Sequence, residues 1–292
     1  NKLLVLIDGR AIYLSTLSGV LWDQQLPPVE DIERIEVVRG PGATLWGANA
    51  VNGVINIVTK HSVDTLGTLA GGMYSSDEDG RIVLRVGRRA GERGAFRAYV
   101  VGHEADGFAY AAPERYQDRS SAAQAGFRYD LDATDRASFT AQADVQTGRS
   151  ELGMVLPAAM PPAPVMGIES DFSGYDLLGR WTRTDSDRAS SLQVYWDHVR
   201  RQEGGLEGVR RLADIDFSQH FRFGQSHEIV WGAGYRWSED EVSGTALQFT
   251  PSSRTDNWFG AYVQDGITVI PDRLSVYVGA KLEHNDYTGW EV

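Results

Sequence analysis

The fold of this protein is decided by the stretch from Arg211 to Ser238, which reads RLADIDFSQHFRFGQSHEIVWGAGYRWS. Apolar residues occupy every second position from Ala213 to Phe217 and again from Ile229 to Trp237. A short Gly-Gln-Ser connection at residues 224–226 separates the two runs. Alternation of this kind predicts two β-strands, each with one apolar and one polar face, joined by a tight turn.

The same pattern repeats along the chain after residue 60. Eleven alternating segments lie near residues 66–75, 81–90, 94–105, 120–131, 136–147, 174–185, 189–200, 211–223, 227–238, 256–269 and 273–287. They are longer than the five or six residues typical of strands in soluble proteins. The sequence therefore predicts an antiparallel meander of unusually long strands.

Tight and longer connections alternate between these segments, which indicates what kind of meander they form. The tight connections are residues 91–93, 132–135, 186–188, 224–226 and 271–272, and the longer ones are residues 106–118, 148–171, 201–210 and 239–255. Large aromatic residues fall near strand ends, at Trp181, Tyr235, Trp237 and Trp258. Tight turns at one end, long loops at the other and aromatic girdles are typical of a transmembrane β-barrel, with lipid on one face and a polar lumen on the other.

Arginines in the second segment depend on that interpretation. Its apolar face runs from Ile82 to Val86 and ends at Arg88, whereas Arg81, Arg85 and Arg89 share the other face. Such a strand is acceptable only if these three arginines line a wet lumen and Arg88 lies at the membrane interface.

Composition narrows the class of protein further. The chain has 292 residues and a formal net charge of −12, so it is not expected to bind nucleic acid, because phosphate contacts need an excess of Lys and Arg. Cysteine is absent, which excludes disulfide scaffolds, thiolate metal sites and cysteine nucleophiles. The chain has no run of roughly 18 apolar residues that would predict a membrane helix, but a barrel strand needs only about ten alternating residues.

The first sixty residues have a different pattern. Leu3–Ile7 is a continuous apolar run, as expected for a strand that is buried on both faces. Residues 27–33 predict a turn that opens a short helix, and Ile35–Arg39 and Gly53–Thr59 read as strands. This part of the chain is predicted to form a small mixed α/β unit.

Three segments in this region carry a family resemblance. VLIDGR at Val5–Arg10, IERIEVVRGP at Ile32–Pro41 and LWGANAVNGVINIVTK at Leu45–Lys60 resemble the plug of TonB-dependent outer-membrane receptors. Later stretches, at Trp231–Arg236 and Lys281–Gly289, resemble barrel segments of the same family. The resemblance covers essentially the whole chain, strongly in the plug and moderately in the barrel.

The resemblance implies a domain organisation. Residues 1–60 correspond to the C-terminal part of the plug, and residues 61–292 to the N-terminal half of a transmembrane barrel, with about 11 of 22 strands. An open half-barrel leaves two unpaired edges that lipid does not tolerate. We therefore expect a full-length protein at least twice this long, with a signal peptide and a TonB box upstream.

It also implies a function. Family members in the outer membrane of Gram-negative bacteria import scarce, bulky nutrients, most often ferric siderophores and otherwise haem or cobalamin. Extracellular loops and plug apices bind the ligand, and TonB, energised by the ExbB/ExbD complex, then displaces part of the plug. The expected partners are TonB, the nutrient, outer-membrane lipid and lipopolysaccharide; no cofactor and no catalysis are expected.

A plug–barrel lock is the first candidate site. Arg39 matches the arginine of the family's Arg-Gly-Pro motif, which pairs with barrel carboxylates, and Glu36 and Gly40 lie beside it. In the family those carboxylates come from later strands, which would lie beyond residue 292. The alternative interpretation is an ordinary surface arginine at the end of a strand.

The ligand site is predicted in the stretch between two plug strands. Tyr13, Trp22, Asp23 and Gln24 lie where family members form an outward apex, and Arg10 is suited to hold an anionic ligand. The alternative is that Tyr13 and Trp22 pack the plug against the wall.

Two features of the loops have a weaker functional reading. Residues 152–168 hold Pro157, Pro161, Pro162 and Pro164 with Met154, Met160 and Met166, which suits a lid or a ligand contact, or else a solvated loop. Acidic clusters at residues 77–79 and 238–241 either bind divalent cations beside lipopolysaccharide or are solvated charge runs.

Enzyme motifs fail on inspection. Residues 42–47 have nucleotide-loop spacing, but Ala48-Asn49 replaces the Lys and Ser or Thr that hold phosphate and metal. The six histidines show no metal-ligand spacing, and no G-x-S-x-G motif is present. The leading alternative to a TonB-dependent transporter is a passive porin-type channel, and the third interpretation is a soluble β-rich binding or adhesion module.

Overall fold

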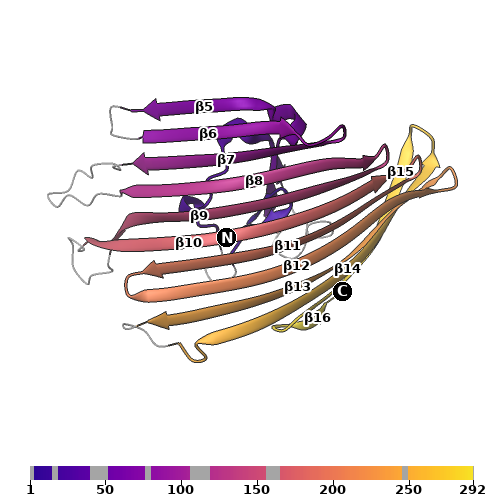
Figure 1. The fold of residues 1–292 in the computed structure, drawn as a ribbon. Helices are drawn as coiled ribbons and strands as arrows, with labels where there is room; N and C mark the ends of the chain where they lie inside the picture. Colours follow the sequence, from indigo (N-terminus) through magenta and orange to yellow (C-terminus); the bar gives the residue numbers. More distant parts are fainter. Residues whose placement is uncertain are drawn as a thin grey trace.

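The computed structural model describes residues 3–14, 19–39, 52–75, 80–105, 119–155, 165–244 and 249–291. Their strands form two β-sheets, a small one near the N-terminus and a large curved one whose strands lie between residues 67 and 291 (Figure 1). We call the small sheet the plug sheet and the large sheet the wall. The plug sheet lies against one face of the wall, which we call its inner face.

The plug sheet has four strands in the order β2-β1-β4-β3. Its elements are β1 (Leu3–Ile7), β2 (Arg10–Ala11), β3 (Ile32–Arg39) and β4 (Gly53–Thr59). β1 and β4 pair in parallel and the other pairs are antiparallel, so the sheet contains both strand directions. Leu4, Leu6 and Val54 form its core, because β1 is buried on both faces.

The helical segments described in this part of the chain are three short 3-10 turns. They are η1 (Trp22–Gln24), η2 (Val29–Asp31) and η3 (Ser62–Thr65). The short helix predicted at residues 27–33 is therefore a single turn, and the following strand already begins at Ile32. No helix among the described residues is long and apolar enough to cross a membrane.

The wall is an antiparallel meander of twelve strands in sequence order. Its strands are β5 (Gly67–Tyr74), β6 (Gly80–Arg89), β7 (Gly94–Ala105), β8 (Ser120–Thr134), β9 (Ala137–Val155), β10 (Val165–Thr184), β11 (Arg188–Glu203), β12 (Leu206–Phe223), β13 (His227–Gly244), β14 (Ser253–Ile270), β15 (Leu274–Asn285) and β16 (Gly289–Glu291). Eleven of them match the eleven predicted segments. The segment predicted at 273–287 ends at Asn285, and a short twelfth strand follows it.

Three connections predicted as long loops are wrong in extent. β9 and β10 continue to Val155 and from Val165, and β13 and β14 continue to Gly244 and from Ser253. The stretch predicted as a loop at 201–210 is a tight hairpin, because Gly204 and Gly205 adopt φ of +56° and +80° and close a two-residue turn. Polar residues near strand ends look like loop sequence, although the hydrogen-bonded ladder runs on through them.

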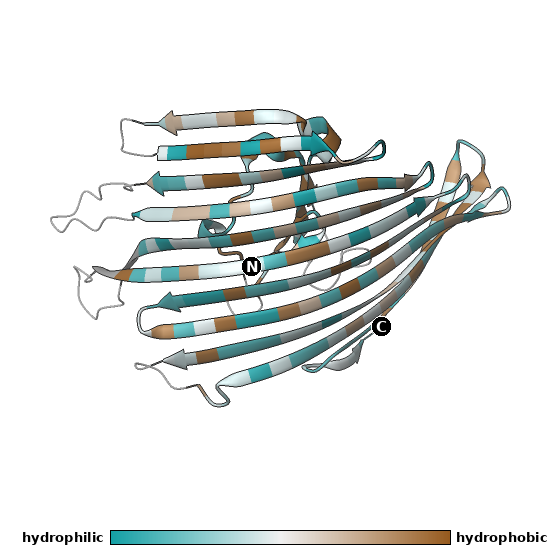
Figure 2. Ribbon diagram, in the orientation of Figure 1, coloured by the Kyte–Doolittle hydropathy of each residue, from teal (hydrophilic) through white to brown (hydrophobic). Residues whose placement is uncertain are grey.

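The two faces of the wall differ in chemistry along every strand, as the banded colouring in Figure 2 shows. Apolar side chains face away from the plug sheet and are exposed, for example Leu84, Val145, Leu177 and Val278, which are 56%, 56%, 51% and 59% exposed. One misassignment concerns Trp258, which was predicted for an aromatic girdle. Trp258 lies opposite Arg236, whose guanidinium is 6.0 Å from its ring centre, so it faces inward.

Candidate functional site

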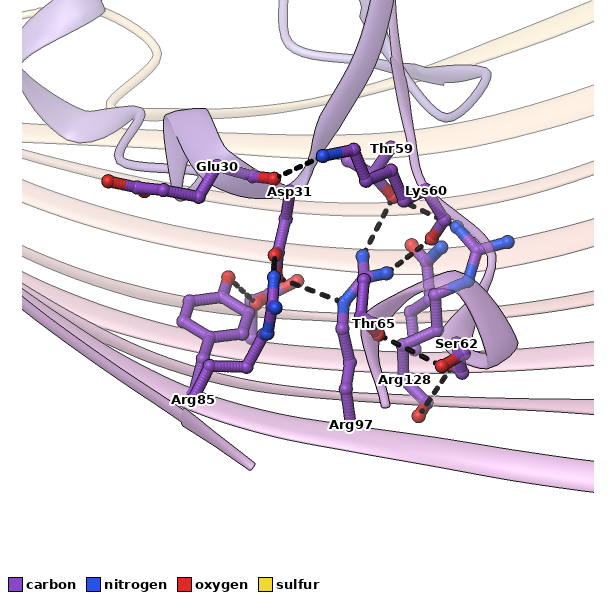
Figure 3. Close-up of polar contacts among 12 residues, drawn as sticks. Glu30, Asp31, Thr59, Lys60, Ser62, Thr65, Arg85, Arg97 and Arg128 are labelled. Atoms are coloured by element: carbon purple, nitrogen blue, oxygen red, sulfur yellow. Dashed lines mark hydrogen bonds and ion pairs between the residues drawn. The ribbon is translucent and has the colours of Figure 1, made fainter. Parts of the chain in front are cut away.

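Buried arginines of the wall meet carboxylates of the plug at the centre of the interface (Figure 3). Asp31, at the end of η2, is only 1% exposed. Arg85 of β6 forms an ion pair with its Oδ1, and Nε of Arg97 on β7 lies 3.2 Å from its Oδ2. Arg81 and Arg85 thus point toward the plug, as predicted for these two arginines.

Arg128 of β8 completes this group, and we call Arg85, Arg97 and Arg128 the wall arginine cluster. Arg97 and Arg128 lie directly opposite each other on neighbouring strands. The hydroxyl of Thr59 accepts a hydrogen bond from each of them, at 3.0 and 2.9 Å, and donates one of 2.7 Å to Asp8. The end of β4 is therefore held between two guanidinium groups.

The connection from the plug sheet to the wall is anchored just below this cluster. Asp130 of β8 accepts hydrogen bonds from the backbone N–H and the hydroxyl of Ser62, at 2.8 and 2.7 Å, and one of 2.8 Å from Arg128. η3 lies directly on β6, where Gly87 leaves room for the carbonyl oxygen of Thr65 that any Cβ would meet. Glycine is required here by close approach rather than by backbone torsion.

A second ion pair lies at the edge of the interface. Arg81 donates two hydrogen bonds to the carboxylate of Glu30, at 2.8 and 2.9 Å. These hydrogen bonds from Arg81 lower the pKa of Glu30 to about 2. Bidentate geometry of this kind fixes direction as well as charge, so η2 is aligned with the wall on both of its acidic residues.

At Arg10 the charges are reversed, because here the plug supplies the cation and the wall supplies the carboxylates. Three wall aspartates on the inner face, Asp144 of β9, Asp176 of β10 and Asp197 of β11, lie directly opposite one another in register. The guanidinium of Arg10 lies 3.1 Å from Asp176 and 2.5 Å from Asp197. Burial alone would lower the pKa of Arg10, but these carboxylates outweigh it and raise that pKa. We call the three residues the aspartate row.

The predicted ligand residues are divided between exposed and buried positions. Trp22 is 54% exposed, whereas Gln24 is 2% exposed and its side-chain nitrogen has no hydrogen-bond acceptor in the part of the chain described. Asp23 forms an ion pair of 2.7 Å with Arg201 and accepts a hydrogen bond of 3.1 Å from Ser150. Tyr13 packs against the core of the plug sheet.

Arg10 was predicted to hold an anionic ligand, and the structure gives it another contact. It is 8% exposed and already paired with two wall carboxylates. Its guanidinium is therefore committed to the wall in this conformation rather than open to an incoming anion.

The residues of the predicted plug–barrel lock lie elsewhere. Arg39 is exposed at the end of β3, and Gly40 is outside the described residues. Glu36 accepts hydrogen bonds from Arg34 and Asn56, at 2.7 and 2.9 Å, so its contacts are within the plug sheet. The pairing of Arg39 with carboxylates of later strands stays a prediction.

The loop features fall mainly outside the described residues. This holds for residues 77–79 and for 156–164, which contain all four prolines and Met160. Residues 238–241 lie within β13, and Glu239 pairs with Arg211 at 2.8 Å. No group of three or more His, Cys, Asp or Glu side chains in the described ranges is arranged to hold a metal ion.

The interface leaves a small cavity between plug and wall. It has a volume of about 40 Å³, enough for a water molecule, and its lining includes Asp8, Arg10, Asp31, Arg97, Arg128 and Asp176. The arrangement is a charge-complementary seat for the plug. Its chemistry is that of holding a folded insert against the wall by paired charges.

Sequence reasoning missed the aspartate row and most of the arginine cluster. Each of these residues lies on the polar face of its predicted strand, so its inward orientation was available from alternation. Their juxtaposition was not, because it depends on the register between strands.

Comparison with known proteins finds similarity to TonB-dependent receptors. The family model of the TonB-dependent receptor plug domain matches residues 1–54. The vitamin B12 transporter BtuB of Vibrio vulnificus strain CMCP6 is 32% identical over 259 residues, which cover 85% of this chain and 40% of that transporter. The ferric enterobactin receptor PirA of Pseudomonas aeruginosa is 32% identical over 117 residues, or 35% of this chain and 16% of that receptor.

Solved structures share the fold over nearly the whole chain. The siderophore receptor PirA from Pseudomonas aeruginosa matches with a TM-score of 0.72 at 19% identity, covering 99% of this chain and 49% of its own. The ferric yersiniabactin uptake receptor FyuA from Yersinia pestis matches with a TM-score of 0.72 at 17% identity, covering 97% and 48%. The chain thus spans about half the length of these receptors, and less of the curated relatives.

A long-stranded antiparallel wall with an apolar outer face and a plug sheet on its inner face is part of a plugged transmembrane β-barrel. The match to the plug-domain model, the similarity to BtuB and the shared fold narrow this class to one family. The chain belongs to the TonB-dependent receptor family.

Proposed function

We propose that this chain is part of an outer-membrane transporter that imports a scarce, bulky nutrient in a TonB-dependent manner. The observation that carries the proposal is the plug sheet held against the inner face of a barrel wall by buried ion pairs. A wide barrel needs a folded insert to prevent leakage. An insert held by polar contacts, rather than by a continuous apolar core, can be released without unfolding the wall.

The proposed parts follow the chain. Residues 1–60 form the C-terminal part of the plug and residues 61–292 the first half of the barrel. TonB, driven by ExbB and ExbD, is the proposed energy-coupling partner, and outer-membrane lipid with lipopolysaccharide surrounds the outer face. We propose an imported ligand and no catalytic step.

The proposed ligand surface is the apex around Trp22, which the structure leaves more than half exposed. Asp23, held by Arg201 and Ser150, fixes the direction of this apex against β9 and β11. Of the other two residues proposed for this surface, Gln24 is buried and Tyr13 is partly buried against the plug core. Arg39, with Glu36 and Gly40, remains the proposed lock to later strands.

Cargo identity is proposed at the level of class. Of the four proteins compared above, one is named as a vitamin B12 transporter, and the other three as ferric enterobactin, siderophore and ferric yersiniabactin receptors. A ferric siderophore is the favoured cargo, and cobalamin is the second candidate because that relative covers most of this chain.

Uptake by the full-length protein tests this function. It is produced in a strain that lacks its own siderophore and cobalamin receptors, and uptake of ferric enterobactin and of cyanocobalamin is measured with and without TonB. We expect uptake of one probe that is lost without TonB. Uptake that survives the loss of TonB supports the porin-type alternative, and uptake of neither probe in either strain removes both cargo proposals.

The soluble-module alternative is tested by fractionation. The apolar outer face predicts that the full-length protein stays in the membrane after an alkaline wash and leaves it only with detergent. Recovery in detergent-free supernatant as a monomer would support the soluble interpretation instead.

A further inference from the structure

We propose that the wall arginine cluster, Arg85, Arg97 and Arg128, is a transit site that binds anionic groups of the transported compound. In the closed state the site is covered by plug carboxylates, and it opens when the plug withdraws. This inference rests on the proposed transport function and deepens it, because it assigns the cargo an anionic character and a contact on the wall below the loops.

The first argument is that Arg85 and Arg97 make their direct ion pairs with the plug rather than with the wall. Arg97 and Arg128 lie directly opposite each other in register, where like charges repel. Arg128 pairs with Asp130 on its own strand. The carboxylate in direct ion-pair contact with Arg85 and Arg97 is Asp31 of the plug, whereas the wall carboxylates Asp130 and Asp144 act on Arg97 only at longer range. Withdrawal of the plug therefore exposes Arg85 and Arg97 to the passage without the carboxylate they pair with, so that an anion from the passage can take its place.

The second argument is unused donor capacity. Nε of Arg85 is buried and makes no hydrogen bond within the described ranges, and Nε of Arg97 has only the 3.2 Å ion-pair contact with Asp31. A guanidinium presents five donors in a planar fork that matches carboxylate and phosphate oxygens. Asp31 thus occupies the position of a ligand carboxylate, and it leaves donors free for a ligand with more oxygens.

The third argument is the surrounding charge. The aspartate row on β9, β10 and β11 lies beside the cluster on the same inner face, and its counter-ion Arg10 leaves with the plug. An anion in the open passage is repelled from the row and attracted to the arginines on β6, β7 and β8. These charges draw an anion toward the wall arginines, which suits an anionic metal chelate.

The competing explanation is that these arginines only hold the plug. The two explanations predict different effects on uptake when the plug residue or the wall residue of one ion pair is substituted. Asp31→Asn and Arg97→Gln both break the pair between η2 and β7, but only Arg97→Gln damages a site on the wall. If the cluster serves transit, Asp31→Asn keeps or raises the uptake rate of ferric enterobactin, whereas Arg97→Gln lowers it several-fold with unchanged binding at the cell surface. Equal effects of the two variants overturn the transit role.

Anion binding itself is tested without any cargo by chemical rescue. In the full-length protein Asp31→Ala removes the resident carboxylate, and Asp31→Ser replaces it if the alanine variant fails to assemble. The readout is the temperature at which the plug becomes sensitive to protease, and the probe is sodium acetate against sodium chloride at equal ionic strength.

We expect acetate to restore at least half of the temperature lost in the Asp31 variant, to leave the wild type unchanged and to have no effect once Arg97→Gln is added. Acetate no better than chloride overturns the site. If the wild type imports neither cargo, the proposed function fails, and the acetate result still decides whether the cluster binds free anions.

Discussion

At the scale of single residues, the plug is held by charges that the wall does not balance by itself. The clearest case is Arg10, which lies between Asp176 and Asp197 and is 8% exposed. Three carboxylates in register on adjacent strands repel one another, and a buried charge without a partner is costly. One plug arginine therefore stabilises both the plug and a strained part of the wall.

We expect Arg10→Ala to loosen the plug strongly, because it removes the cation that is paired with Asp176 and Asp197. Removing one partner of a buried pair costs about 3–5 kcal/mol. The measurement is the urea concentration at which the plug of the full-length protein becomes sensitive to protease. Arg34→Ala is the matched control, since Arg34 pairs with Glu36 at an exposed position and such pairs contribute less than about 1 kcal/mol. Equal midpoints for the two variants would contradict this account.

The Glu30–Arg81 pair predicts a pH dependence. The pKa of Glu30 is lowered from 4.5 to about 2 by hydrogen bonds from Arg81. A carboxylate with a depressed pKa stabilises the folded state above its unfolded pKa and loses that contribution as the pH falls through its folded pKa. We expect Glu30→Gln to weaken plug retention at pH 6 by less than about 1 kcal/mol, because the group is partly exposed.

The difference between wild type and Glu30→Gln should shrink as the pH falls from about 4.5 and vanish below about 2. Protease sensitivity of the plug along a pH series with an acid-active protease measures it. A difference that grows toward low pH would refute the assignment.

At the scale of elements, η3 is the segment of the chain that connects the plug sheet to the wall, and it contacts the wall directly. It packs on β6 through the gap left by Gly87 and is bonded to β8 through Ser62 and Asp130. A 3-10 turn of four residues has little stability of its own. Its position is therefore set by the wall, and any side chain at residue 87 must displace it.

Gly87→Ala is expected to push η3 off β6 and to cost about 1–3 kcal/mol, as overpacking usually does. Gly179→Ala is the control, because a Cβ there meets Cγ2 of Val194 at an ordinary 3.6 Å. Thermal release of the plug, followed by protease sensitivity, compares the two. A loss in Gly179→Ala as large as in Gly87→Ala would show that the effect is one of strand glycines in general.

Elements were largely predictable from alternation, and contacts between them were not. The run Ile229–Trp237 predicted β13 and its apolar face, and Leu3–Ile7 predicted a strand buried on both sides. Periodicity carries no information about register, so the alignment of Asp144 with Asp176 could not be derived. Trp258 was misassigned because the position of an aromatic residue near a strand end does not show which face it lies on. Its pairing opposite Arg236 places it on the inner face.

At the scale of the whole molecule, the outer face is a continuous apolar surface that crosses the wall from strand to strand. Leu84, Val100, Ala125, Val145 and Tyr175 lie opposite one another in register from β6 to β10. A surface this large is tolerated in lipid, whereas in water it would drive aggregation. Above it on β10, Ser173 and Asp171 mark the change to polar side chains.

A charge placed on this surface should cost more the deeper it lies. We expect Leu177→Arg to destabilise the full-length protein in bilayers by about 2–4 kcal/mol and Ser173→Arg by at most about 1 kcal/mol. Both residues are exposed on the same face of β10, four positions apart. Urea unfolding in lipid vesicles measures the difference, and equal costs would mean that Leu177 does not face the hydrocarbon.

The aspartate row also limits how such a receptor can be recombined. A plug grafted from another receptor must place a cation at the position of Arg10 and carboxylates at the positions of Asp8 and Asp31. Without them it leaves buried wall charges unpaired and will not bind stably to the wall. Plug and wall therefore carry complementary charges at fixed positions. Changing these charges on either one requires compensating substitutions on the other.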